Sequence, residues 1–81
     1  MAYSEDEVLA GLAEIVNEET GLAADTITAD KSFVDDLDID SLAMMTIVSL
    51  AEERFEVTIP DEAVKELVTV GQAVAYITAQ N

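Results

Sequence analysis

The stretch DDLDIDSL, residues 35 to 42, joins a long polar segment to a helix, and it carries aspartates at alternate positions. Asp36, Asp38 and Asp40 stand two residues apart, and Ser41 follows the last of them. Asp40 suits an N-cap because its side chain accepts a hydrogen bond from a free amide of the first helical turn. The stretch therefore predicts a helix that begins at Ser41, with a serine hydroxyl at its positively polarised end.

The same aspartates match the first half of an EF-hand calcium loop. Such a loop also needs glycine at its sixth position and a bidentate glutamate at its twelfth. With Asp36 first, Ser41 falls at the sixth position and Ile47 at the twelfth, so both defining positions fail. We expect no dedicated metal site, although so acidic a cluster is compatible with weak, non-specific binding of divalent cations.

Upstream of this stretch, the sequence predicts an amphipathic helix over residues 5–20. Ser4 and Glu7 form a capping box at its start, and Gly21 suits its end because glycine readily adopts the left-handed conformation. Its apolar residues recur at helical spacing and form one face: Val8, Leu9, Leu12, Ile15 and Val16.

Residues 22–40 show no helical pattern. A structureless loop of this length is uncommon in a compact domain. We therefore expect an ordered loop, held against the core by Ile27, Phe33 and Leu37.

The helix that starts at Ser41 is expected to end near Phe55. Seven apolar residues form its broad core face: Ala43, Met44, Ile47, Val48, Leu50, Ala51 and Phe55.

Two shorter helices are predicted after a link over residues 56–59. Pro60 indicates the start of a third helix, through about Leu67, because proline is favoured at a first helical position. Thr69 and Gln72 repeat the capping-box pattern and predict a last helix whose inward residues are Val70, Ala73, Val74 and Ile77. No alternation predicts a strand. The fold class is all-α: a small four-helix bundle with a long ordered loop between helices one and two and a short third helix, in one domain over residues 1–81.

The composition limits the possible functions. The 81 residues include eighteen acidic and three basic ones, without histidine or cysteine, and the net charge is −15. Lacking the usual general base and thiolate ligands, the chain is not expected to be an enzyme. Nucleic acid and anionic membranes would repel it, whereas basic protein surfaces would attract it. We expect a cytoplasmic monomer without a membrane span.

Two apolar residues beside Ser41 indicate a contact surface. On a helical projection Leu42 and Met45 share the polar side with Ser41, and Glu52 and Glu53 lie further along it. An apolar pair rimmed by acids is typical of a docking surface for a partner with a basic rim. The alternative is that both side chains pack beneath the preceding loop.

Ser41 itself is suited to carry a phosphate ester, because the free amides and partial positive charge of a helix N-terminus favour an anion. No base neighbours it in the sequence, and the nearby aspartates disfavour its ionisation. Covalent chemistry at this hydroxyl must therefore be performed by another enzyme.

The triplet Asp40-Ser41-Leu42 resembles the attachment motif of acyl carrier proteins, whose serine receives a 4′-phosphopantetheine arm from coenzyme A. The triplet alone is weakly specific, but the similarity extends over essentially the whole chain through SFVDDLDIDSL (32–42), AEERFEVTIPDE (51–62) and TVGQAVAYI (69–77). Many family members have glycine where Asp38 stands, and the form DLDIDSL is most like that of actinobacterial, meromycolate-type carriers of type II fatty-acid synthases.

The resemblance implies a carrier of growing fatty-acyl chains, held as thioesters on an arm attached to Ser41. The implied partners are a phosphopantetheinyl transferase, malonyl transacylase, ketosynthase, ketoreductase, dehydratase and enoyl reductase. They would dock through basic surfaces on Asp40, Leu42, Met45, Glu52 and Glu53. Family members shelter acyl chains between their helices, and the matching positions here are Phe33, Ile47, Ala51, Ile59, Ala63 and Leu67.

Two other functions stay open at this point. The segment SLAMM (41–45) is also similar to carriers of aromatic polyketide synthases, which use the same arm in another pathway. An acidic cation-binding or interaction module without any modification is the second.

Overall fold

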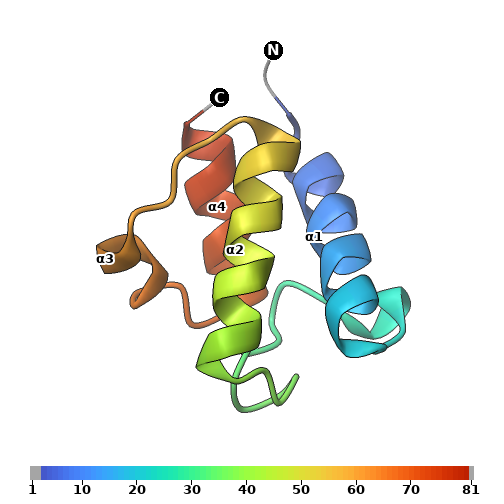
Figure 1. Cartoon of the computed structure of the whole chain (residues 1–81). Coiled ribbons are helices and arrows are strands. Elements are labelled where there is room, and N and C mark those ends of the chain that lie inside the picture. The colour runs from blue at the N-terminus through green and yellow to red at the C-terminus, as the bar shows by residue number, and fades with distance from the viewer. Residues whose placement is uncertain (1–2, 81) are drawn as a thin grey trace.

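The computed structural model describes residues 3–80, which form helices around a long internal loop (Figure 1). The four α-helices are α1 (Glu5–Thr20), α2 (Ser41–Phe55), α3 (Asp61–Val64) and α4 (Val70–Ala79), and a single 3₁₀ turn, Ala24–Thr26, lies within the loop. The all-α class, the long ordered loop and the short third helix are thus confirmed. Within residues 3–80 there is no strand, only an isolated β-bridge between Ser32 and Thr69. The expected domain of residues 1–81 includes Met1, Ala2 and Asn81, which lie outside the described residues.

The helix α1 begins and ends as its capping residues predict. The Ser4 hydroxyl accepts a hydrogen bond from the Glu7 amide at 3.2 Å, and the Glu7 carboxylate accepts one from the Ser4 amide at 3.1 Å. Gly21 has a φ of 79° and donates its amide hydrogen to the Asn17 carbonyl. Of the predicted core face, Leu9 is half-buried, and the other members are buried: Val8, Leu12, Ile15 and Val16.

The helix α4 also begins at its predicted capping box. The Gln72 amide donates to the Thr69 hydroxyl at 3.2 Å, and the Thr69 amide donates to the Gln72 side chain at 3.0 Å. The predicted inward residues are all buried: Val70, Ala73, Val74 and Ile77.

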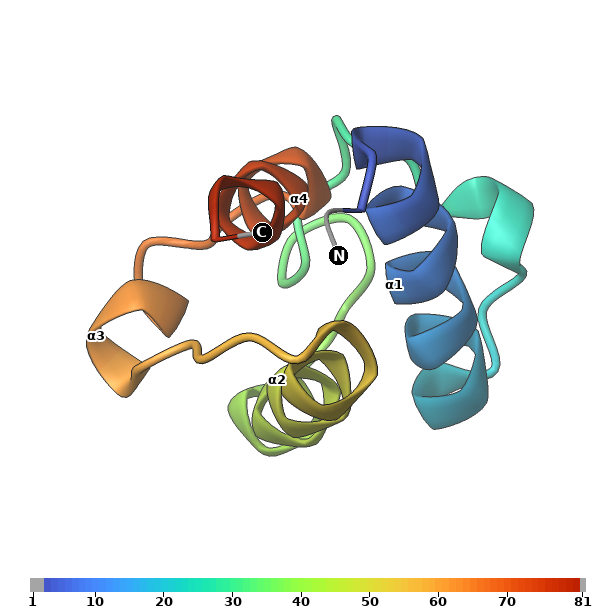
Figure 2. The same cartoon turned by 90° about the horizontal axis from the view of Figure 1, so that it is seen from above.

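Three helices surround the loop, as the view from above shows (Figure 2). The helix α1 packs against both α2 and α4, and α3 stands on the far side of the bundle from α1. The predicted anchors Ile27, Phe33 and Leu37 are buried. Ile39, which the sequence pattern did not indicate, is also buried. It anchors the end of the loop in the core, one residue before Asp40.

Backbone hydrogen bonds join this loop to the start of α4. The Phe33 amide donates to the Val68 carbonyl at 3.0 Å, and the Gly71 amide donates to the Ala29 carbonyl at 2.8 Å. Gly71 permits this approach because a Cβ at its position would lie 2.9 Å from the Ala29 oxygen. The loop therefore fixes the start of α2 relative to α4.

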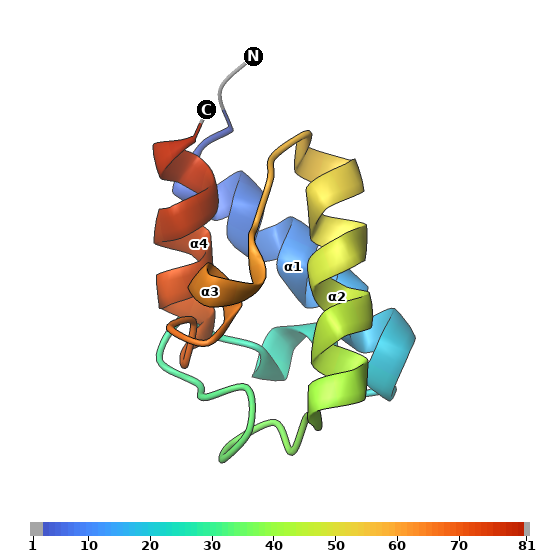
Figure 3. The same cartoon turned by 60° about the vertical axis from the view of Figure 1, so that its left-hand side comes forward.

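The predicted limits of the third helix, Pro60 to about Leu67, are wrong. The helix α3 covers only Asp61–Val64, and Pro60 is its extended N-cap, with ψ at 156°. Beyond the helix, the Leu67 amide bonds to the Val64 carbonyl, three residues back, so the chain tightens and buries Leu67. Figure 3 shows the resulting single turn in front of the space between α2 and α4.

The link between α2 and α3 is held at two places. The Ile59 amide donates to the Glu52 carboxylate at 2.7 Å. The Thr58 backbone exchanges two hydrogen bonds with the Gln80 side chain, at 3.3 and 2.8 Å. These contacts position α3 beside α2. Among the described residues, no helix is long and apolar enough to cross a membrane.

Candidate functional site

Ser41 is the first residue of α2, and its side chain is exposed. The Asp40 carboxylate accepts a hydrogen bond from the Ala43 amide at 2.8 Å, as predicted for an N-cap. The Met44 amide makes the first intrahelical bond, to the Asp40 carbonyl at 2.9 Å. The amides of Ser41 and Leu42 precede that bond, so they lie at the positively polarised end of the helix.

The other aspartates of the stretch shape the loop. The Asp36 carboxylate accepts a hydrogen bond from the Ser32 amide at 2.7 Å, and Asp38 adopts a left-handed φ of 54°. Further upstream, the Thr28 hydroxyl donates to Asp30 and lowers the pKa of that carboxyl below its usual value of 3.8. Within residues 3–80, no group of three His, Cys, Asp or Glu side chains is arranged to hold a metal ion.

The apolar pair beside Ser41 faces solvent. Leu42 is 79% exposed and Met45 is 46% exposed. The alternative in which both pack beneath the preceding loop is therefore wrong. Glu53 is exposed as well, whereas Glu52 is half-buried and uses one carboxylate oxygen to hold the Ile59 amide.

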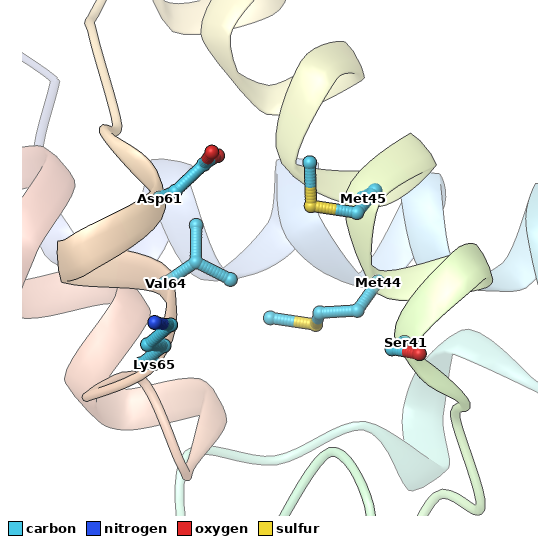
Figure 4. Close-up of a pocket in the computed structure, with 6 residues that line it drawn as sticks. All are labelled: Ser41, Met44, Met45, Asp61, Val64 and Lys65. Atoms are coloured by element: carbon cyan, nitrogen blue, oxygen red, sulfur yellow. The ribbon is translucent and has the colours of Figure 1, made fainter.

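A cavity of about 320 Å³ lies next to Ser41, between α2 and α3 (Figure 4). The helix α2 contributes three residues at i, i+3 and i+4, which share one helix face, and α3 with its C-cap residue contributes three at the same spacing. Figure 4 shows the Met44 thioether reaching from α2 toward α3. The two methionines and a valine give the cavity an apolar interior. Its full lining is Ser41, Met44 and Met45 from α2, Asp61 and Val64 from α3, and Lys65 at the C-cap of α3.

The residues matched to the family's acyl shelter lie elsewhere, in the packed core. Ala63 is half-buried and borders that core, and the other five belong to it: Phe33, Ile47, Ala51, Ile59 and Leu67. None of the six lines the cavity beside Ser41. Their role in sheltering acyl chains stays a prediction.

The sequence pattern did not indicate which residues line the cavity on the α3 side. Asp61, Val64 and Lys65 were not singled out, although their spacing repeats that of Ser41, Met44 and Met45. That shared spacing was the available signal, but it does not indicate which face of a one-turn helix points at which neighbour.

The site fits a phosphodiester group on Ser41. The hydroxyl is exposed, the first-turn amides favour an anion, and an apolar cavity opens alongside. Within the described residues, no buried polar side-chain atom lacks a hydrogen-bond partner. An added group therefore has room beside the serine without breaking a buried hydrogen bond.

Comparisons with known proteins point to one family. The family model described as a phosphopantetheine attachment site matches residues 10–77. An acyl carrier protein of Beutenbergia cavernae is 73% identical over 77 residues, covering 95% of this chain and 94% of the relative. One of Kineococcus radiotolerans is 73% identical over 75 residues, covering 93% of each chain.

The fold of this chain is also similar to that of a solved structure. The acyl carrier protein from Enterococcus faecalis superposes with a TM-score of 0.81 at 34% sequence identity. The match covers 98% of this chain and 100% of that one. The similarity therefore extends from the serine segment to the whole arrangement of helices.

Proposed function

Since this chain belongs to the acyl carrier protein family, we propose that it carries growing fatty-acyl chains as thioesters on a 4′-phosphopantetheine arm attached to Ser41. The observation that supports the attachment residue is the exposed hydroxyl of Ser41 at the start of α2, inside the segment that matches the attachment-site model. The protein then acts as a carrier, and the catalysis belongs to its partners.

This chain supplies the Ser41 hydroxyl as the nucleophile and holds it at the start of α2. A phosphopantetheinyl transferase supplies the base. In this transfer the Ser41 oxygen would form a phosphodiester bond with the phosphopantetheine phosphate of coenzyme A. The pyrophosphate bond of coenzyme A would break, adenosine 3′,5′-bisphosphate would leave, and the base of the transferase would take the serine proton. The first-turn amides of Ser41 and Leu42 would stabilise the negative charge of a phosphodiester held there. When bound, the group supplies a terminal thiol that forms thioesters.

Partners dock on the exposed side of α2 in this proposal. Leu42 and Met45 provide the apolar contact, and Asp40 and Glu53 attract a basic rim. Glu52 contributes less, because its carboxylate holds the Ile59 amide. The partners are the modifying transferase and the malonyl transacylase, ketosynthase, ketoreductase, dehydratase and enoyl reductase of fatty-acid synthesis, and the chain meets them in the cytoplasm as a monomer.

Acyl chains enter between α2 and α3. Met44 and Val64 line the cavity there. Five of the six expected shelter residues belong to the core beyond it, and Ala63 borders that core. Methionine adapts its shape readily, so Met44 can turn aside when a chain enters. The proposed path runs from the cavity toward Ile47, Ala51, Ile59, Ala63, Leu67 and Phe33.

Intact-mass measurement tests the attachment. The purified protein is incubated with coenzyme A, Mg²⁺ and a broad-specificity phosphopantetheinyl transferase. We expect the wild type and Ser49→Ala, which removes another exposed serine of α2, to gain one phosphopantetheine group. Ser41→Ala should gain none. No gain in the wild type, while a known carrier is modified in the same reaction, would contradict the proposal and favour an unmodified interaction module.

The pathway needs a second comparison, because carriers of aromatic polyketide synthases use the same arm. The loaded protein is offered to a fatty-acid ketosynthase and to a polyketide ketosynthase. Faster transfer with the fatty-acid enzyme is expected from the similarity to the actinobacterial relatives. Faster transfer with the polyketide enzyme would reassign the pathway and leave the carrier function unchanged.

A further inference from the structure

Positive charge is scarce in this protein, so the place of each basic residue is informative. The chain contains Lys31, Arg54 and Lys65 against eighteen acidic residues. The Arg54 guanidinium is paired with the Glu14 carboxylate at 2.9 Å, on the α1 side of α2. Lys31 belongs to the loop before Ser32. Lys65, at the C-cap of α3, is the basic residue that lines the cavity beside Ser41.

Lys65 and Ser41 stand on opposite walls of that cavity (Figure 4). The flexible four-carbon stem of a lysine lets its ammonium move within such a space. Asp40 neighbours Ser41 in the chain, and Asp61 shares the cavity wall with Lys65. Figure 4 draws the Ser41 oxygen turned away from Lys65, so an anion on Ser41 reaches the ammonium when these side chains rotate toward the cavity. There it meets negative charge at Asp40 and Asp61 and positive charge at Lys65.

We propose that Lys65 is a positioning residue for the prosthetic group, and that its ammonium forms an ion pair with the phosphodiester on Ser41. This inference rests on the proposed function. The pair would hold the phosphodiester beside the cavity that Lys65 lines. It also links α3 to the start of α2, so attachment of the arm stabilises the folded protein through Lys65.

Asp61 opposes this pairing. It is the first residue of α3 and lies four residues before Lys65, the C-cap, a helical spacing at which opposite charges attract each other. Its carboxylate competes with the phosphodiester for the ammonium and repels the phosphodiester directly. Asp61→Asn should therefore strengthen the link between Lys65 and the arm.

A thermal-unfolding comparison tests the ion pair. The melting temperature is measured for the unmodified and modified forms of the wild type, Lys65→Gln and Lys31→Gln. Both substitutions remove one positive charge, so they change the overall charge equally, but only Lys65 lines the cavity. For each protein, the melting temperature of the unmodified form is subtracted from that of the modified form. This difference should be lower in Lys65→Gln than in the wild type by roughly 1–6 °C, the size expected when a small domain loses one surface ion pair.

Three controls define the outcome. Lys31→Gln should show the wild-type change, Lys65→Arg should restore it, and salt at about 1 M should abolish the difference because it screens exposed charges. The ³¹P signal of the phosphodiester should shift in Lys65→Gln and stay unchanged in Lys31→Gln. Intact mass reports whether each variant is modified, which tests the carrier function separately. Full modification with the same melting and ³¹P behaviour in both glutamine variants would overturn the role of Lys65 and leave the carrier function standing.

Discussion

Asp36, Asp38 and Asp40 share one residue type and one spacing, yet the structure gives each a different role. Asp36 closes the loop on the Ser32 amide, and Asp40 caps α2 through the Ala43 amide. Asp38 sits between them in the left-handed region, with φ at 54°. In that conformation a side chain is crowded by the backbone, and glycine is not.

Replacing Asp38 with glycine should stabilise the protein. Relief of the left-handed strain is partly offset by the greater freedom of glycine in the unfolded chain, which leaves a gain of up to about 1 kcal/mol. Urea unfolding measures the free energy. Asp38→Asn keeps the Cβ and removes the charge. It should therefore raise the free energy of unfolding only by the part of the gain that comes from weaker repulsion among the acidic residues. If Asp38→Asn gave the whole gain, charge rather than backbone strain would be the cause.

At the scale of the element, α2 uses its two sides differently. Its inner side buries Ile47, Val48, Ala51 and Phe55, whereas Ala43, Met44 and Leu50 of the expected core face are only half-buried. Its outer side leaves Leu42 and Met45 exposed beside Ser41. A helix arranged in this way can change its outer residues with little effect on the fold.

Met45→Glu should slow acyl transfer by partner enzymes while leaving the melting temperature near that of the wild type. Loss of an apolar contact at the centre of an interface typically costs 1 kcal/mol or more, so kcat/KM should fall by about tenfold. Ala10→Glu adds the same charge at an exposed position of α1 and serves as the control. Unchanged kcat/KM with several partners would show that Met45 lies outside the contact surface.

The contact between α1 and α2 depends on a glycine. A Cβ at Gly11 would lie 2.4 Å from Cζ of Phe55, whose ring also packs edge-on against Tyr3 with centroids 5.1 Å apart. Gly11 therefore admits the Phe55 ring, and a larger residue would push the two helices apart.

Gly11→Ala should destabilise the protein in spite of the better helix propensity of alanine. Overpacking costs about 1–3 kcal/mol and the propensity gain returns about 1 kcal/mol, so a net loss of about 1 kcal/mol is expected in urea unfolding. In a Phe55→Leu background, which removes the tip of the ring, the loss should shrink. An equal loss in both backgrounds would mean that another contact of Gly11 is responsible.

At the scale of the whole molecule, charge opposes compaction. A net charge of −15 is carried by a small bundle whose Cα radius of gyration is 11.1 Å. The exposed Arg54–Glu14 pair offsets little of the repulsion among these negative charges, because a surface ion pair contributes at most about 1 kcal/mol to stability.

Added salt should therefore raise the melting temperature. Between about 20 mM and about 200 mM NaCl the screening length falls to less than the size of the domain, and repulsion among the carboxylates weakens. Choline chloride at the same ionic strength separates screening from cation binding, and Mg²⁺ should act at lower concentration than either salt. A melting temperature that does not change with ionic strength would show that repulsion is not a significant term.

The limits of α1, the start and end of α2 and the start of α4 could all be predicted from the sequence. These features depend on hydrogen bonds between residues close in the chain, such as Ser4 with Glu7 and Asp40 with Ala43. A local pattern is sufficient for them because both partners of each bond lie within the pattern.

The length of α3, the path of the loop and the cavity beside Ser41 could not be predicted from the sequence. These depend on contacts between residues far apart in the chain: Phe33 with Val68, and Thr58 with Gln80. The spacing of Asp61, Val64 and Lys65 is visible in the sequence. Nothing in the sequence indicates that they line one cavity with residues of α2. The reason is physical: a one-turn helix has little stability of its own, so the packing around it sets both its ends and the direction it faces.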